Sequence, residues 1–351
     1  MPDFPFQLSQ KQSNALRIAT FLATVMVVLR HSFNLHHFYD GGNPWMVITD
    51  ANIAVQRIFV GITNVAIPAF FFMSGFLFFR DIQSWKDCLP KWQKRINTLL
   101  VPYLSWNLLL LVLVLALSLL SKLRPQLHAT YGLSYSANWM LDKLTMHPIM
   151  GHFWYIRTLI IFLLFAPLLH LLFKDNALSF IVLFILARCW KPIDTGILST
   201  EGMLYFFCGS WMANHGWLPA AYLPRKWLWM LVPIGYSFFI PTLFPCCPSL
   251  PGGVAMCMYL GWQICLWLAE CPKITAVLLG LNKYSFFLYA LHATYVSGMS
   301  LLLSRLLPHT PIYSFLTYIS CFLATLTLCL AIAFAVKKLL PKAYSFLSGG
   351  R

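Results

Sequence analysis

The sequence predicts an all-α, polytopic membrane protein with about ten transmembrane helices. Its 351 residues are 59% hydrophobic and only 10% charged, and the mean hydropathy is +0.71. A soluble globular domain carries about 25% charged residues, so this composition excludes an ordinary soluble protein. Long apolar runs recur along the whole chain, and each approaches the roughly 20 residues that one helical crossing of a bilayer requires.

Ten apolar stretches are the expected spans. Two of them, at 177–190 and 200–213, are short, which suits tilted, broken or re-entrant helices. Polar stretches near 36–55 and 122–150 are expected to be loops, and none is long enough for a separate soluble domain. We therefore predict one membrane domain over residues 1–351, with spans at about 15–35, 56–79, 97–121, 152–173, 177–190, 200–213, 227–245, 253–269, 284–303 and 313–336.

The positions of the basic residues predict the orientation. With the N-terminus inside, most of the 25 lysines and arginines fall on the cytoplasmic side, as the positive-inside rule requires. An even number of spans then places both termini in the cytoplasm. The formal charge of +15 follows from this topology and from attraction to anionic membrane lipid. Because the basic residues flank spans, nucleic acid is not an expected partner.

His31 is the first candidate for chemistry. It ends the apolar run 16–29 and follows Arg30. An ionisable group at membrane depth costs roughly 2.5–3.5 kcal/mol and usually faces a cavity. An imidazole with a pKa of about 6.5 is suited to proton transfer near neutral pH. The nearby His36, His37 and Asp40 match no compact metal-ligand spacing, so no metal is predicted.

The fourth and sixth stretches each open with a charged residue. Arg157 follows Trp154 and has five donors that suit an anionic group or an oxyanion, although it could instead reach lipid headgroups. Trp154 fits an interfacial aromatic belt. Ser199 or Thr200, just before Glu201, could cap the helix, while the Glu201 carboxylate interacts favourably with the helix dipole. Alternatively, Glu201 orients the first-span histidine or pairs with a buried arginine.

Spans two and nine carry polar residues within apolar sequence. Ser74-Gly75, with Pro68 upstream, predicts a kink that frees backbone groups to line a cavity, or close helix packing at Gly75. His292 lies in the middle of span nine. It is either a satisfied core histidine or a residue that lines the substrate cavity.

Three cations precede span three. Lys91, Lys94 and Arg95 are spaced three and four residues apart, so they share one helix face. Such a face could bind phosphates from the cytoplasm through charge-assisted hydrogen bonds. The alternative is ordinary positive-inside flanking of a span.

Taken in order, six fragments of the chain resemble the bacterial acyltransferase 3 family of integral membrane acyltransferases, in its form without a soluble domain. The fragments run from span one to span nine and so cover nearly the whole chain. They are Val27-Val-Leu-Arg-His31-Ser, Pro68-Ala-Phe-Phe-Phe-Met-Ser-Gly75-Phe, Lys94-Arg95-Ile-Asn-Thr-Leu-Leu-Val-Pro102-Tyr103, Phe153-Trp-Tyr-Ile-Arg157-Thr-Leu, Glu201-Gly-Met-Leu-Tyr-Phe-Phe and Ser285-Phe-Phe-Leu-Tyr-Ala-Leu-His292.

The resemblance implies transfer of an acyl group, often acetyl, from a cytoplasmic acyl-CoA. The implied acceptor is a hydroxyl of a cell-envelope polysaccharide or a lipid-linked glycan, at the bacterial inner membrane. The family's catalytic histidine lies in the first span, which assigns His31 as general base. The family arginine eleven positions earlier is Thr20 here, and Arg17, one turn away, is expected to replace it.

The other candidates take roles in the same scheme. The CoA phosphates are expected at Arg17, Lys91, Lys94 and Arg95, and the oxyanion or acceptor at Arg157. Glu201, Arg30, Trp154, Ser74 and His292 are expected to line the cavity. The alternative is a non-enzymatic exporter or flippase of a glycan or lipid-linked precursor on the same scaffold. The acceptor, the acyl chain length and the oligomeric state are left open.

Overall fold

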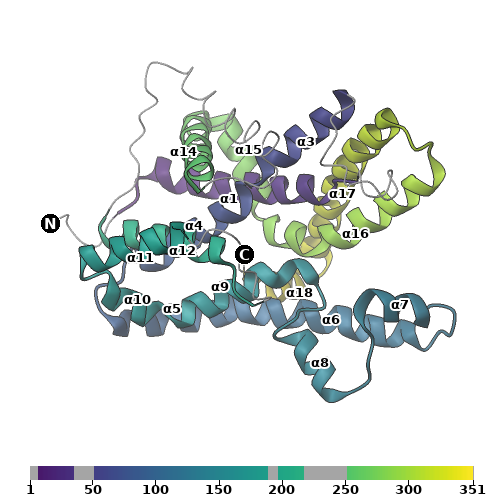
Figure 1. The fold of residues 1–351 in the computed structure, drawn as a ribbon, viewed down its shortest axis with the longest axis horizontal. Coiled ribbons are helices and arrows are strands. Elements are labelled where there is room, and N and C mark those ends of the chain that lie inside the picture. Colours follow the sequence, from purple (N-terminus) through teal and green to yellow (C-terminus); the bar gives the residue numbers. More distant parts are fainter. Residues whose placement is uncertain (1–6, 35–50, 189–196, 217–250, 351) are drawn as a thin grey trace. The chain divides into compact units, whose positions relative to one another are not determined.

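The computed structural model describes residues 7–34, 51–188, 197–216 and 251–350. These residues form helices and no strands, which confirms the all-α class (Figure 1). The expected span at 227–245, most of the polar stretch 36–55, and the residues His36, His37 and Asp40 lie outside the described residues. The chain divides into two compact units, Met1–Arg80 with Cys208–Ala335, and Asp81–Phe207 with Val336–Arg351.

Among the described residues, five helical stretches are long and apolar enough to cross a membrane. Two further pairs of helices, bent by 57° and 116°, raise the number to seven if each pair is one span. The pairs are Gly151–Leu164 with Ala166–Leu172 and Gly253–Leu268 with Pro272–Asn282. The count of ten and the cytoplasmic termini stay predictions. The five stretches are Gln10–His31, Ala51–Phe79, Trp85–Ser118, Ser285–Leu306 and Pro311–Leu339.

Helix α1 (Gln10–His31) packs against five other helices of the first unit. These are α3 (Ala51–Thr63), α4 (Ala66–Phe79), α14 (Pro251–Leu268), α15 (Pro272–Asn282) and α16 (Ser285–Leu306). A capping box formed by Ser9 and Gln12 begins the helix, satisfying donors that a first turn leaves unpaired. Phe21 and Val28 of α1 then join one apolar cluster with residues of α16 and α17 (Pro311–Leu339), namely Leu288, Val296 and Cys329.

Helix α4 makes a close contact with α12 (Thr200–Asn214). A Cβ atom added to Gly209 would collide with the backbone of Phe72, so only glycine permits this approach. Helix α4 continues from Ala66 to Phe79 across Ser74-Gly75, and the kink expected there stays a prediction. The helical interruption lies earlier, at Asn64 and Val65.

The second unit is built around α6 (Val101–Ser118), which follows α5 (Cys88–Arg95) and a short π-helix, η2 (Ile96–Leu100). Pro102 has no N–H with which to continue the regular helical ladder there. The end of α18 (Pro341–Ser348) packs on this region. Gly349 approaches the backbone of Thr98, and the Trp106 indole donates a hydrogen bond of 3.0 Å to the Leu347 carbonyl.

The polar stretch 122–150 was expected to be a loop, and this expectation is wrong. It contains α7 (Arg124–Tyr131) and α8 (Ala137–Leu144). Gly132, at φ +59°, ends α7, and its N–H donates to the His128 carbonyl at 2.8 Å. Ser136 caps α8 by accepting from the Trp139 N–H at 3.3 Å. Both helices span eight residues, which is too short for a clear apolar period.

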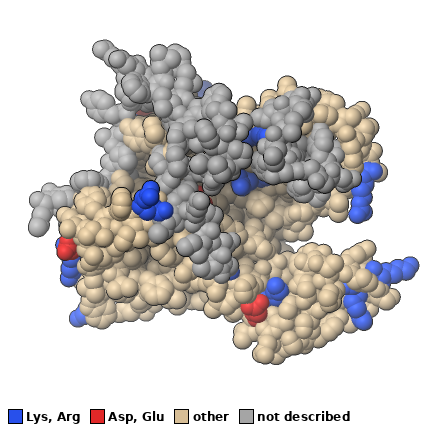
Figure 2. Space-filling view, viewed as in Figure 1, with Lys and Arg blue, Asp and Glu red and all other residues tan. Residues whose placement is uncertain are grey.

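The remaining described helices of the second unit are short. They are η1 (Trp85–Asp87), η3 (Gly151–Phe153), α9 (Trp154–Leu164), α10 (Ala166–Leu172) and α11 (Asn176–Arg188). Large apolar side chains are exposed on α11, as they are on α6, and Figure 2 shows a described surface with few charges. Exposed apolar faces of this extent are typical of helices that contact lipid. They include Leu108, Val112 and Leu113 on α6, and Phe180, Phe184 and Ile185 on α11.

We expect Gly209→Leu to destabilise the first unit, because the new side chain must displace the backbone of α4. Gly261→Leu on α14 is the matched control, since a Cβ there meets no atom within 4 Å. Thermal unfolding of the detergent-purified protein measures both. The Gly209 variant should lose about 1–3 kcal/mol or fail to fold, whereas an equal loss in the Gly261 variant would contradict the assigned contact.

Candidate functional site

His31 lies at the C-terminal end of α1, and its side chain is exposed. Its ring meets the ring of His292 edge to face, with centroids 5.0 Å apart and an interplanar angle of 62°. His292 is fully buried in α16, and its Nδ1 lies 2.7 Å from the Tyr289 carbonyl oxygen. Because a carbonyl only accepts, His292 Nδ1 carries the proton and Nε2 the lone pair. The two histidines predicted separately are thus brought together.

A buried polar network holds the chain just after His31. The Asn34 side-chain amide donates to the Ser314 carbonyl at 3.0 Å, and the Ser314 hydroxyl donates back to Asn34 Oδ1 at 3.0 Å. Gln56 Nε2 donates to the Ser314 hydroxyl at 3.3 Å. All three side chains are completely buried. The network ties the segment after α1 to α3 and α17.

Arg30 holds the residue just before His31. Its guanidinium donates a hydrogen bond to the side-chain oxygen of Asn64, at the junction of α3 and α4. Arg30 also interacts electrostatically with the phenol of Tyr318, a buried residue of α17 that stacks with Phe59. His31 is therefore held by fixed neighbours on both sides in sequence.

Arg17, Thr20 and Ser74 belong to the same unit as His31. The Thr20 hydroxyl donates to the Leu16 carbonyl at 2.9 Å, so this hydroxyl is bound to the helix backbone. Arg17 is exposed on α1, and a rise of 1.5 Å per residue puts its Cα about 21 Å from that of His31. Ser74 is half-buried within α4.

The three cations predicted to share a helix face do lie on one helix, α5. Their surroundings differ. Lys91 Nζ lies 3.7 Å from Asp81 Oδ2, and Arg95 is half-buried and interacts electrostatically with Tyr155. Lys94 is exposed. Of the three, Lys94 is therefore the most accessible to a ligand from solution.

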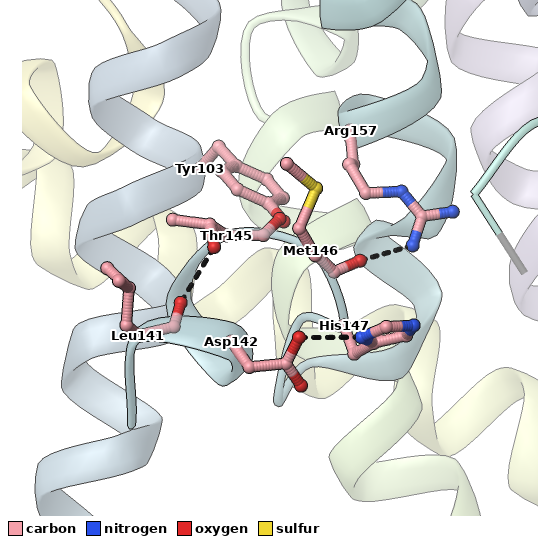
Figure 3. Close-up of polar contacts among 7 residues, drawn as sticks. All are labelled: Tyr103, Leu141, Asp142, Thr145, Met146, His147 and Arg157. Atoms are coloured by element: carbon pink, nitrogen blue, oxygen red, sulfur yellow. Dashed lines mark hydrogen bonds and ion pairs between the residues drawn. The ribbon is translucent and has the colours of Figure 1, made fainter. Parts of the chain in front are cut away.

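Arg157 is buried in α9 and contacts backbone (Figure 3). Its two terminal nitrogens donate to the carbonyls of Met146 and Ile197, the latter at 3.0 Å. The Tyr103 hydroxyl donates at 2.5 Å to the carbonyl of Thr145, the residue before Met146. Arg157 therefore has a structural task, which is to hold the segment that follows α8. Its predicted role with an oxyanion or acceptor stays a prediction.

Glu201 and Trp154 both lie at the start of helices, and both residues belong to the second unit. Glu201 lies in the first turn of α12, and Ser199 Oγ accepts from the Gly202 N–H at 3.0 Å. Of the two predicted caps, Ser199 is therefore the one that forms the capping hydrogen bond. Trp154 is the first residue of α9 and is exposed. The participation of either residue in a reaction stays a prediction.

Sequence reasoning missed the polar residues that position His31. Their only signal was a polar side chain inside or beside an apolar run, and the partner of each lies far along the chain. They are Asn34, Gln56, Asn64, Ser314 and Tyr318. Within the described part of the chain, no group of three or more His, Cys, Asp or Glu side chains could hold a metal ion.

We expect Ser314→Ala to lower stability by about 1–3 kcal/mol, because it leaves buried polar atoms of Asn34 and Gln56 unpaired. Thr327→Ala, an exposed hydroxyl on the same helix, is the matched control. Thermal unfolding in detergent compares the two variants with wild type. Equal midpoints for Ser314→Ala and wild type would show that the network does not support the end of α1.

Comparison with known proteins identifies a family model that matches the chain. The family model of the acyltransferase domain of the acyltransferase 3 type matches residues 14–334, nearly the whole chain. No curated protein and no solved structure matches the chain. The matched range includes His31, His292 and the residues that surround them. This chain therefore belongs to the acyltransferase 3 family.

Proposed function

We propose that this membrane acyltransferase moves an acyl group, typically acetyl, from acyl-CoA to a hydroxyl group, with His31 as the general base. The observation that carries the proposal is the geometry of His31. Its ring is accessible, no described residue forms a hydrogen bond with it, and it rests against the buried ring of His292. A base must be reachable by its substrate and held in one place, and His31 meets both requirements.

The proposed reaction is a direct transfer. A ring nitrogen of His31 takes the proton of the acceptor hydroxyl while the hydroxyl oxygen attacks the thioester carbonyl carbon. The tetrahedral intermediate then loses its C–S bond, and the departing CoA sulfur takes the proton from the His31 imidazolium. The products are an ester and free CoA thiol. The lone pair on His292 Nε2 suits an N–H of His31, which would leave the other His31 nitrogen as the base.

The CoA phosphates are assigned to the cations of α5, of which Lys94 is the most exposed, and the role expected for Arg17 stays a prediction. Charge-assisted hydrogen bonds are the expected form of these contacts. Arg157 already donates two hydrogen bonds to backbone carbonyls, so we assign it to supporting the fold of the second unit. Arg30 and Ser74, which belong to the same unit as His31, are assigned to the lining of the substrate cavity. The participation of Glu201 and Trp154 stays a prediction.

The acceptor is proposed to be a cell-envelope polysaccharide or a lipid-linked sugar at the bacterial inner membrane. Membership of the acyltransferase 3 family and several helices long enough to span a membrane support this location. Envelope glycans offer hydroxyls at a membrane surface, where a membrane enzyme can reach them. No metal enters this scheme, because the histidine supplies the acid–base chemistry.

We expect His31→Ala to reduce transfer of labelled acetyl from acetyl-CoA to an envelope-glycan extract by about 10²- to 10⁴-fold, the usual contribution of a general base. His309→Ala is the matched control, since His309 is another histidine of the first unit, whose Nε2 contacts the Ser304 carbonyl. Membranes containing equal amounts of each variant are compared. Wild-type transfer by the His31 variant would contradict the proposed mechanism.

The same assay separates the transferase from an exporter or flippase. Purified wild-type protein that neither binds acetyl-CoA nor transfers or hydrolyses its acetyl group would favour transport. Binding of acetyl-CoA without transfer would mean that the wrong acceptor or acyl chain had been offered.

We expect Lys94→Gln to raise the KM for acetyl-CoA about 3- to 10-fold with kcat nearly unchanged, because it removes a contact made equally in the ground and transition states. Lys122→Gln is the control, since Lys122 is exposed outside α5. Steady-state kinetics in membranes measure both constants. An unchanged KM would remove α5 from the donor site.

A further inference from the structure

The second unit contains a half-open cavity of about 510 Å³ that the proposed reaction does not use. Its lining residues come from the end of α7, the end of α8 and the start of η3. Its size falls within the range of about 300–1,000 Å³ that is typical of sites for small ligands. The lining residues are Thr130, Tyr131, Gly132, Lys143, Pro148, Ile149 and Gly151.

The wall of the cavity is firmly held in place. Pro148 and Ile149 are buried, and they belong to the segment whose carbonyls bind Tyr103 and Arg157 (Figure 3). The Ile149 N–H donates to the Lys143 carbonyl at 2.9 Å. At the end of the segment, the Met150 N–H donates to Asn107 Oδ1 at 3.1 Å. Little reorganisation is therefore needed for a ligand to enter.

The charged residue among those that line the cavity is Lys143, which is half-buried. The neighbouring acid, Asp142, does not line the cavity, and its carboxylate lies 2.7 Å from His147 Nδ1 (Figure 3). Among the lining residues, Lys143 is therefore the one cation and no acid opposes it. A ligand with one negative charge complements this arrangement.

Several other groups in the wall suit a hydroxyl-rich ring. Thr130 donates its hydroxyl hydrogen to the Gln126 carbonyl at 2.9 Å, so its oxygen presents lone pairs to a ligand. The Tyr131 phenol is a hydrogen-bond donor at neutral pH, and burial raises its pKa further. A Cβ added to Gly132 or Gly151 would meet no atom within 4 Å. The backbone at these glycines is therefore open to a ligand.

We propose that this cavity binds a sugar ring that carries one acidic group, either a carboxylate or a phosphate, with the acidic group placed at Lys143. The Pro148 and Ile149 side chains supply an apolar wall for the C–H face of the ring, and Thr130 and Tyr131 contact its hydroxyls. This inference goes beyond acyl transfer, and because binding is measured directly, it does not depend on the role of His31.

Binding of four probes to the full-length protein in detergent tests the proposal by saturation-transfer NMR. Glucuronate and glucose 6-phosphate carry the acidic group on a sugar, glucose lacks the acid, and inorganic phosphate lacks the sugar. We expect at least one sugar acid to bind about fivefold or more tightly than glucose and inorganic phosphate, because a charge-assisted contact adds about 1 kcal/mol or more. The comparison of glucuronate with glucose 6-phosphate decides between carboxylate and phosphate.

Three variants locate the binding. Lys143→Met should weaken binding of the sugar acid at least about fivefold, and Lys143→Arg should retain it, because the arginine keeps the charge. Gly151→Leu should block the cavity without a backbone clash. Lys122→Met is the matched control and should bind as wild type, because Lys122 is an exposed lysine that does not line the cavity.

Unchanged thermal midpoints show that each variant is folded. The proposal is overturned if folded Lys143→Met binds the sugar acid as wild type does. It is also overturned if glucose binds as tightly as the sugar acids, if inorganic phosphate alone accounts for the binding, or if no probe binds. Should Gly151→Leu fail to fold, the comparison of Lys143→Met with Lys143→Arg decides the outcome alone.

Discussion

The hydrogen bonds among Asn34, Gln56 and Ser314 are the constraint on which the candidate active site depends. A polar group without a partner is costly in an apolar environment, where water cannot replace the missing contact. These three buried side chains satisfy one another only when the segment after α1 meets α3 and α17. The cost of separating them therefore fixes the end of α1, and the position of His31 follows.

The contact between the rings of His31 and His292 depends on this constraint. Since the Tyr289 carbonyl fixes the proton of His292 on Nδ1, the lone pair of that ring is on Nε2. The exposed His31 ring then rests on a partner with a fixed tautomer. In the second unit, Arg157 also forms hydrogen bonds to the backbone. It donates to the carbonyls of Met146 and Ile197 and so stabilises a cavity wall. In both units a predicted functional residue depends on hydrogen bonds to backbone atoms.

Composition and apolar runs predict the all-α class because the cost of unsatisfied backbone groups in lipid leaves few alternatives to helices. His31 and His292 could each be selected as ionisable residues inside apolar sequence. Their contact could not be predicted, since it depends on how α1 packs against α16. Ser314 was missed for the same reason, because an isolated serine in an apolar helix has no distinctive spacing. The helices α7 and α8 were missed because caps, rather than a long apolar period, define them.

Chemical rescue tests the central claim most directly. Acetyl transfer from acetyl-CoA is measured for His31→Ala with and without added imidazole, with His309→Ala measured in parallel. If His31 is the base, imidazole should restore part of the lost rate to His31→Ala and leave the His309 variant unchanged. Full transfer by His31→Ala without imidazole would contradict the account and would assign the proton transfer to another group.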